Sequence, residues 1–476
     1  MAGFADRVYS ASPIWLQQVW VTLYGAWWHH GRFGGRFRQQ VAEIRRRDGW
    51  SAEQWSAYQN DRLSAIGRAA GRSAYYRHVF QDVGVRSEEI DLATLHRLPY
   101  LEKDTLRQRA TDLLTQTPPR GTIIMRSSGT TGTPTDIYYP RDFHTLELAF
   151  HEARSKNWAG VSYTDRRAMF GVRKVCRFDQ AKPPFWRHSL IENMVYLSIY
   201  HLTPRYMPAY VDFLNRFRPK VVMGYPSALG TLAHFALDSR RELVPAQVVI
   251  TTSETLTVAT REALEAAWHC RVWDMYGAVE QCMLATQCEY GNYHVSPDVG
   301  VVEIVDGQGN PCRPGEPGEV ICTGLQSELQ PLIRYRVGDL ATWSVQQTCA
   351  CERQMPILES IQGRYEDICF TVDGRAMLRF DTVFKGIRAI QQAQVIQEAI
   401  DRFTVLVVPT IEFGEHDIKL IKNNMMLHAG DVQVNVQQVD TIPRTQSGKF
   451  KAVVSRLSAE EKSKLWRTDR VVTSGT

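Results

Sequence analysis

Between residues 120 and about 360, short apolar runs alternate with segments whose apolar residues recur at helical spacing. The strand-like runs lie at 220–223, 247–250 and 271–275, and the helical patterns at 228–237 and 258–268. Such alternation predicts an α/β fold with a mainly parallel sheet and crossover helices. In sheets of this kind ligands bind beyond the carboxyl ends of the strands, so the loops that follow these runs are the expected position of a site.

The pattern changes on either side of this region. Residues 1–100 are polar and mostly helical in spacing, and after residue 300 short strand-like runs with a Pro-Gly turn at 314–318 predict a small appended sheet. From about residue 367, alternating runs such as 403–408 and a few helices predict a separate α+β domain. We therefore expect a large N-terminal domain with mixed and parallel sheets, made of a helical segment and a core at 101–366, and a small C-terminal domain at 367–476.

Composition narrows the class of protein. The chain has 476 residues, of which 44% are hydrophobic, so it can bury a large core and a second domain. A net charge of +5 is too small to indicate nucleic-acid binding by itself. The nine cysteines are spread too widely for a disulfide framework and no secretory leader is visible, so we expect a reduced, cytoplasmic setting.

An aromatic and basic segment stands near the N-terminus, within and after an apolar stretch that is too short to span a bilayer. Its members are Trp15, Trp20, Tyr24, Trp27 and Trp28, followed by Arg32, Arg36, Arg38, Arg45, Arg46 and Arg47. One interpretation is that this segment lies on an anionic membrane surface, as peripheral contact. The other is that it packs on its own domain and the arginines form a solvated face.

The loop at 126–135, Arg-Ser-Ser-Gly-Thr-Thr-Gly-Thr-Pro-Thr, lies between two strand-like runs at 122–125 and 136–139. Its glycines let backbone N–H groups turn toward an anion, and its hydroxyls can donate to phosphate oxygens, as a triphosphate requires. It is not a Walker loop, because no Gly-Lys-Ser/Thr closes it and no helical pattern follows. Taken alone, the loop is equally well explained as a hairpin without a ligand.

Five further segments follow in a fixed order. They are Ser253-Glu254, 276–280 (Tyr-Gly-Ala-Val-Glu), 335–340 (Tyr-Arg-Val-Gly-Asp-Leu), 363–367 (Gly-Arg-Tyr-Glu-Asp) and 443–449 (Pro-Arg-Thr-Gln-Ser-Gly-Lys). Together with the loop, this set resembles the adenylate-forming superfamily of acyl-CoA synthetases and related ligases. The closer resemblance is to the phenylacetate–CoA ligase branch, especially members found with capsular-polysaccharide genes. It covers most of the chain, and six motifs in order are far more specific than any one of them.

The resemblance implies an ATP site with Mg²⁺. The residues that would hold the ATP phosphates are Ser127, Ser128, Gly129, Thr130, Thr131 and Gly132. Those that would surround the nucleoside are Glu254, Tyr276, Gly277, Asp339 and Arg364, with Asp339 accepting from both ribose hydroxyls. Glu280 would hold Mg²⁺ against the phosphates.

Lys449 is the expected catalytic residue, together with Glu280. A lysine ammonium between the carboxylate and the α-phosphate would stabilise the charge of the transition state. The resemblance also implies a swinging C-terminal domain that presents Lys449 for the first step and withdraws for the second, with Glu366 at the hinge. The segment 369–375 has the pattern of a hairpin, where CoA ligases commonly have a glycine-rich stretch. This difference weakens the expectation that CoA is the acyl acceptor more than it weakens the expectation of adenylation.

Cys288, His294, Cys349 and Cys351 form a second set. Three thiolates and one imidazole make a complete set of ligands for tetrahedral zinc. The resemblance implies such a site too, because some members of the branch carry a structural zinc of this kind. The alternative is that these are buried small residues, since free cysteine is among the most buried types.

The acid itself is not identified by the sequence. The segment with Tyr225, Pro226 and Ser227 resembles the family's acyl-pocket wall, and Arg173 or Arg177 could meet an anionic group or face solvent. The expected function is ATP-dependent adenylation of a carboxylic acid, followed by acyl transfer to CoA. Transfer to an amine and a noncatalytic role as an assembly partner stay open as alternatives.

Overall fold

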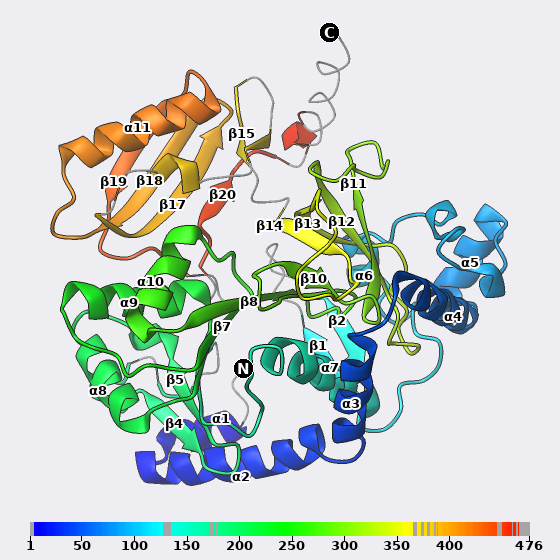
Figure 1. Cartoon of the computed structure of the whole chain (residues 1–476), viewed down its shortest axis with the longest axis horizontal. Coiled ribbons are helices and arrows are strands. Elements are labelled where there is room, and N and C mark those ends of the chain that lie inside the picture. The colour runs from blue at the N-terminus through cyan, green and yellow to red at the C-terminus, as the bar shows by residue number, and fades with distance from the viewer. Residues whose placement is uncertain are drawn as a thin grey trace.

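The computed structural model describes most of the chain. The described residues are 4–126, 135–171, 175–177, 179–364, 369–372, 376–377, 381–384, 387, 389–444, 450–458, 460–462 and 465. Figure 1 shows a large body built around one sheet, with a smaller sheet and its helix above it. This is the α/β arrangement with a small α+β unit that the sequence predicts.

Helices dominate the first hundred residues, as expected. They are α1 (Phe4–Ala11), α2 (Ile14–Phe33), α3 (Phe37–Arg47), α4 (Ala52–Ala70) and α5 (Ala74–Val83), followed by α6 (Lys103–Gln108). Local chemistry sets their ends: Ser51 and Gln54 form a capping box at the start of α4, and Gly84 ends α5 in the left-handed conformation. Among the described residues, no helix is long and apolar enough to cross a membrane.

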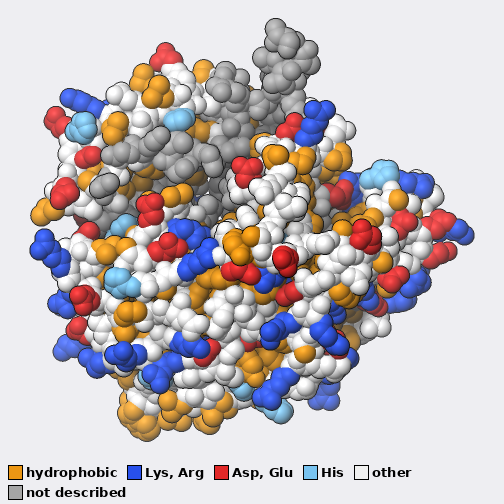
Figure 2. Space-filling model, viewed as in Figure 1, with side chains coloured by type: hydrophobic (Ala, Val, Ile, Leu, Met, Phe, Trp, Pro, Cys, Tyr) orange, Lys and Arg blue, Asp and Glu red, His pale blue; other side chains and the backbone are white. Residues whose placement is uncertain are grey.

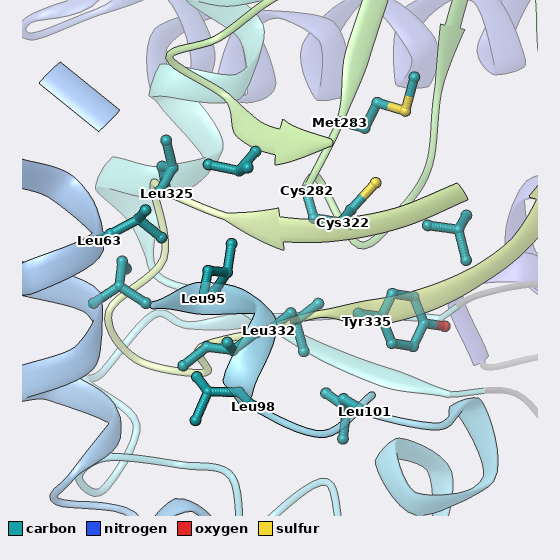
Figure 3. Close-up of a cluster of buried hydrophobic side chains, with 14 of the residues drawn as sticks. Leu63, Leu95, Leu98, Leu101, Cys282, Met283, Cys322, Leu325, Leu332 and Tyr335 are labelled. Atoms are coloured by element: carbon teal, nitrogen blue, oxygen red, sulfur yellow. The ribbon is translucent and has the colours of Figure 1, made fainter. Parts of the chain in front are cut away.

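The N-terminal helices share a hydrophobic core with the sheet. Leu63 of α4 and Leu98, which lies between α5 and α6, pack in one cluster with Leu332 and Tyr335, as Figure 3 shows. Each fully buried leucine contributes about 1.5–3 kcal/mol, so this shared core is the main force that holds the helices in place.

A twelve-stranded mixed sheet forms the centre of the molecule, with the order β11-β12-β13-β14-β10-β9-β8-β7-β6-β3-β5-β4. Its strands are β3 (Arg167–Gly171), β4 (Trp186–Ser189), β5 (Met194–Ser198), β6 (Val221–Gly224), β7 (Val248–Thr252), β8 (Arg271–Gly277), β9 (Leu284–Gln287), β10 (Tyr293–Val295), β11 (Gly300–Val305), β12 (Pro317–Gly324), β13 (Tyr335–Trp343) and β14 (Ile357–Arg364). The run β5-β3-β6-β7-β8 is parallel, and α8 (Met207–Phe217), α9 (Pro226–Asp238) and α10 (Val258–Trp268) are its crossover helices. The predicted parallel sheet is therefore confirmed.

The expected separate appended sheet is wrong. Strand β8 pairs antiparallel with β9, β9 with β10, and β10 with β14, so the strands after residue 300 continue the same sheet. The joining register sets His294 against Ile357, which lie far apart in the sequence. Local patterning cannot reveal such a nonlocal pairing, because it reports strands and not their partners.

The glycine-rich loop does connect two strands. Strand β1 (Ile123–Arg126) pairs antiparallel with β2 (Asp136–Tyr139), and Arg126 stands opposite Asp136 at the loop end of the pair. Helix α7 (Arg141–Phe150) follows, and a π-helical turn (His151–Lys156) continues it.

The C-terminal part forms a four-stranded sheet in the order β19-β18-β17-β20, with α11 (Glu415–Ala429) packed on it. The strands are β17 (Ile390–Ala399), β18 (Arg402–Pro409), β19 (Gln433–Gln438) and β20 (Val453–Ser455). Before them, β15 (Cys369–Phe370) pairs with β16 (Ala376–Met377), which confirms the expected hairpin at 369–375. Figure 1 shows this unit above α9 and α10.

Candidate active site

The parallel strands end at one edge of the sheet, and the segments after β5, β6, β7 and β8 carry the polar groups of the site. Strand β6 can lie so close to β3 because Gly224 has no side chain: a Cβ there would be 2.5 Å from the Phe170 carbonyl oxygen. The next residue, Tyr225, is buried and precedes α9, whose first residue is Pro226. The tight packing of β6 thus sets the direction of the predicted acyl-pocket wall.

Tyr276 and Asp339 meet although β8 and β13 are far apart in the sequence. The Tyr276 hydroxyl donates a hydrogen bond of 2.5 Å to Asp339 Oδ2. Burial and the Asp339 carboxylate raise the pKa of Tyr276, so the phenol stays a neutral donor. The Cα of Arg364 on β14 pairs with that of Asp339 on β13, so these two predicted nucleoside residues lie opposite each other on neighbouring strands.

Glu280 is oriented by Tyr335, a residue for which the sequence analysis predicted no role. The Tyr335 hydroxyl donates to Glu280 Oε1 at 3.0 Å. Tyr335 is the first residue of β13, which also carries Asp339, so one phenol–carboxylate hydrogen bond links β13 to β8 and another links it to the turn after β8. Nothing in the sequence marks Tyr335 except its place at the start of that motif.

The loop around Glu280 is also held from β2 and α7. The Tyr139 hydroxyl donates to the Val279 carbonyl, and Gln281 Nε2 donates to Glu147 Oε1 at 3.3 Å. Burial would raise the pKa of the Glu147 carboxyl, but hydrogen bonds with His144 and His151 lower it to about 2. The carboxylate is therefore ionised and keeps the loop anchored to the helix that follows the hairpin.

Glu254 joins the two parts of the chain. Its Oε2 accepts from the Ser227 N–H at 3.1 Å, and its Oε1 accepts from the Phe450 N–H at 2.6 Å. Arg444 Nη1 donates to Ser227 Oγ at 2.8 Å and lies 3.9 Å from Glu254 Oε1. The Tyr200 phenol, which follows β5, interacts electrostatically with the Arg444 guanidinium.

These contacts bring the C-terminal segment onto the strand ends. Arg444 and Phe450 flank the residues 445–449, and both bind the edge that carries Ser227 and Glu254. A further hydrogen bond, from Gln392 Nε2 to Thr231 Oγ1, joins β17 to α9 at 2.7 Å. The sequence could not place Glu254 here, because the partner lies almost two hundred residues away.

Several predicted site residues lie outside the described residues. They are Ser127, Ser128, Gly129, Thr130, Thr131, Gly132, Arg173, Glu366 and Lys449. Arg177 is described, and its guanidinium pairs with Asp179 on an exposed part of the surface. Arg177 therefore faces solvent, which is the second of the two alternatives that the sequence left open.

The predicted cysteine and histidine set comes together at the turns between β9 and β10 and between β13 and β14. One ligand atom from each of Cys288, His294, Cys349 and Cys351 lies within 4.8 Å of all the others. The sulfurs of Cys288 and Cys349 are 3.6 Å apart, and Cys351 Sγ is 3.3 Å from His294 Nε2. Four convergent donors of this kind can hold a tetrahedral metal ion.

Neighbouring groups support this cluster. The Asn292 side-chain amide donates to Cys349 Sγ at 3.1 Å, and the Tyr290 N–H donates to Cys288 Sγ at 3.3 Å. The second ring nitrogen of His294 lies 3.4 Å from the Met355 carbonyl oxygen. Ligating histidines are usually oriented by such a contact on their other nitrogen.

Two protein-family models match the chain. Residues 193–327 match the AMP-binding enzyme family, and residues 372–456 match the CapK C-terminal domain. Protein CapK of Staphylococcus aureus is 23% identical over 468 residues, which cover 95% of this chain and 99% of CapK. A phenylacetate-coenzyme A ligase of Thermus thermophilus is 26% identical and covers 66% of this chain and 72% of that enzyme.

Among solved structures, 2-hydroxyisobutyryl-CoA ligase in its postadenylation state has a TM-score of 0.69 at 19% identity, covering 90% of this chain and 94% of that one. The same enzyme in its thioesterification state gives 0.54. The fold, the site and the family matches define an AMP-binding enzyme of the adenylate-forming superfamily. Within it, the CapK C-terminal domain match and the similarity to CapK and to phenylacetate–CoA ligases support a CapK-like branch.

Proposed function

We propose that this chain activates a carboxylic acid with ATP, releasing pyrophosphate, and passes the acyl group from the acyl-adenylate to CoA. The observation that carries the proposal is the Tyr276–Asp339 pair at the strand ends, beside the edge where Arg444 and Phe450 dock. A carboxylate with a fixed phenol neighbour is suited to accept from the ribose hydroxyls. Residues 445–449, which include Lys449, are flanked by Arg444 and Phe450, and both of these bind the edge that carries Ser227 and Glu254.

In this mechanism the described side chains position the reactants. Glu280 would hold Mg²⁺, which neutralises phosphate charge when bound, and Tyr335 fixes the direction of that carboxylate. Glu254 anchors the segment before and after Lys449, whose ammonium would stabilise the charge that develops on the α-phosphate. We propose that residues 367–476 then move about Glu366, which removes Lys449 for the second step.

The acceptor is the part of the function that needs an experiment. Pyrophosphate release should be measured over a panel of aliphatic, aromatic and hydroxy acids, first without an acceptor and then with CoA or with amines. CoA should stimulate release and consume free thiol. Stimulation by amines alone, with the amide as product, would make the chain an amide ligase instead. If no acid in the panel releases pyrophosphate, the result favours a noncatalytic role as an assembly partner.

We also propose a structural zinc ion held by Cys288, His294, Cys349 and Cys351. Tetrahedral Zn²⁺ with bonds of about 2.0–2.3 Å keeps its ligand atoms about 3.3–3.8 Å apart, and the 3.6 Å and 3.3 Å found here lie in that range. The cluster ties the turn at β9–β10 to the turn at β13–β14 and is remote from the nucleotide residues along those strands. The ion would supply stability, not chemistry.

We propose, finally, that the enzyme works in a reducing, cytoplasmic compartment as a peripheral membrane protein. Its nine cysteines are all free thiols, which is typical of reduced surroundings. Contact with the membrane would be made through the N-terminal helices.

A further inference from the structure

Helix α2 turns its apolar side toward solvent. Trp15, Leu23 and Trp27 are 67%, 56% and 69% exposed, and Val19, Trp20 and Tyr24 of the same helix are also exposed. These residues recur at spacings of three and four, so they form one stripe along a helix about 30 Å long. A helix on the surface of a water-soluble protein normally directs such a stripe to the core.

The polar side of α2 faces the protein instead. Gln17 is buried, and its Oε1 accepts from Arg187 Nε at 2.8 Å. Gln18 Oε1 accepts from the His188 N–H at 2.8 Å, and the Thr22 hydroxyl donates to the His188 carbonyl at 3.4 Å. Both Arg187 and His188 belong to β4, the edge strand of the sheet. The helix is therefore inverted relative to the usual amphipathic arrangement.

Close packing holds this orientation. A Cβ on Gly25 would lie 2.1 Å from Ser189 Oγ, so α2 approaches the end of β4 at a glycine and could not do so with a larger residue. Rotation of the helix would break the hydrogen bonds of Gln17 and Gln18. The exposed apolar stripe is thus a built feature of the fold.

A second element extends the stripe. The turn between β4 and β5 presents Leu190 and Ile191, which are 74% and 54% exposed, next to the middle of α2. Figure 2 shows a dense group of hydrophobic side chains at the lower edge of the molecule, where α2 and β4 lie in Figure 1, with Lys and Arg side chains near it. We name the α2 stripe and this turn together the apolar face.

Charge distinguishes the apolar face from an ordinary protein contact. No Asp or Glu occurs from residue 7 to residue 42. Exposed arginines follow the helix at Arg36, Arg38, Arg45 and Arg46. Arg32 lies over the Trp28 ring at 4.3 Å, which adds a cation beside the aromatic end of the stripe.

We propose that the apolar face docks on an anionic lipid bilayer, with α2 lying in the plane of the interface. Tryptophan and tyrosine are favoured at the level of the lipid headgroups, and arginines near them attract anionic lipid. A second copy of the chain fits less well, because a two-fold contact would place two α2 helices that carry no acidic residue against each other and bring their arginines together. The proposal specifies the membrane contact named above and does not depend on the reaction.

The test uses the full chain and co-sedimentation with vesicles of phosphatidylcholine, with or without phosphatidylglycerol. The wild type should bind the anionic vesicles and bind neutral ones about tenfold more weakly, with anionic binding reduced at high salt. The combined substitution Trp15→Ser, Leu23→Ser and Trp27→Ser should weaken binding to the anionic vesicles at least about tenfold. Its thermal unfolding should stay cooperative and near the wild-type temperature, since these side chains face solvent.

A matched control removes three exposed apolar residues elsewhere. Val345, Ile411 and Leu427 are 75%, 103% and 80% exposed. Their combined replacement by serine should leave vesicle binding unchanged. The proposal is overturned if the wild type stays in the supernatant with both vesicle types, or if the Trp15/Leu23/Trp27 variant binds like the wild type. It is also overturned if light scattering finds a dimer that this variant converts to a monomer.

Discussion

Asp339 is the residue that we propose binds the ribose, and the sugar of the nucleotide tests that role. Its Oδ2 already accepts from Tyr276, and a buried carboxylate that also accepts from both ribose hydroxyls loses one bond when the sugar is 2′-deoxy. An unpaired buried acceptor costs about 1–3 kcal/mol, so dATP should be the poorer substrate by about tenfold. Asp339→Asn should reduce this preference and Asp339→Ala should remove most of it. The measurement is the ATP/dATP ratio of pyrophosphate release.

The two phenols provide a matched pair for that experiment. Tyr276→Phe removes the donor to Asp339 and should alter the ATP/dATP ratio. Tyr335→Phe removes the donor to Glu280 and should raise the Mg²⁺ concentration needed for half-maximal rate, with the ratio unchanged. Equal effects of both substitutions on the ratio would contradict the assignment of Asp339 to the ribose.

Asp274 gives a prediction about pH. It is buried beneath the site on β8, and burial raises its pKa from 3.8 to about 6, despite hydrogen bonds from Thr251 and Tyr293. The folded state therefore binds this proton more tightly than the unfolded state, so stability falls as pH rises from about 4 to 6 and is then constant. At about 1.36 kcal/mol per pKa unit, the loss is about 3 kcal/mol.

The comparison is between the wild type and Asp274→Asn, which cannot titrate. The free energy of unfolding of the wild type should decline relative to the variant by about 3 kcal/mol between pH 4 and pH 7. Because all other groups are shared, their titration cancels in the difference. A difference that does not vary with pH would show that Asp274 is not perturbed.

At the scale of elements, the contact between the C-terminal segment and the strand ends is the feature with the clearest consequence. Arg444→Ala and Glu254→Gln remove groups that hold the residues around Lys449. Each should slow acyl-adenylate formation about tenfold or more, which corresponds to about 1.4 kcal/mol of transition-state stabilisation. Thioester formation from a supplied acyl-adenylate should be nearly unchanged.

Gln392→Ala is the control, because it removes a hydrogen bond between the same two parts of the chain that involves neither Arg444 nor Glu254. It should slow adenylation much less than Arg444→Ala. Equal losses in the three variants would mean that the contact serves general docking and does not position the lysine segment.

The cysteine and histidine cluster allows a similar comparison. Protein purified without chelator should contain about one zinc per chain. Cys349→Ser and Cys351→Ser should lower thermal stability and release the metal, while the KM for ATP changes little. Cys270→Ser alters a half-buried cysteine outside the cluster and should do neither. Metal analysis that finds no zinc in the wild type would refute the assignment.

Elements with a strong local pattern were predictable from the sequence. The crossover helices α9 and α10 and the parallel strands β6, β7 and β8 lie within a few residues of their predicted positions. The junction of β10 with β14 was not predictable, because it depends on which strands meet. The inverted orientation of α2 was equally hidden, since its aromatic residues suit burial or exposure and only the contacts of Gln17 and Gln18 decide. Likewise, the hydrogen bond between Glu254 and the Phe450 N–H depends on the tertiary arrangement and could not be predicted from local pattern.

For the whole molecule, the relation of the two parts predicts how the half-reactions separate. Lys449→Ala should abolish acyl-adenylate formation, because the charge at the α-phosphate is no longer stabilised. ATP binding and acyl transfer from a supplied acyl-adenylate should persist, since neither uses that ammonium. Single-turnover measurement of the two steps makes the distinction. Equal loss of both steps in a folded variant would overturn the role of Lys449.

Helix α2 has one more consequence, for aggregation. Strand β4 ends the twelve-stranded sheet, and an uncovered end strand offers its peptide groups to strands of other molecules. Gln18 and Thr22 occupy the N–H and carbonyl of His188, so the helix substitutes for the missing neighbour strand. A chain that began after α2 would leave this end open. Fibrillar or amorphous self-assembly, more than loss of catalysis, is the failure that such a truncation should produce.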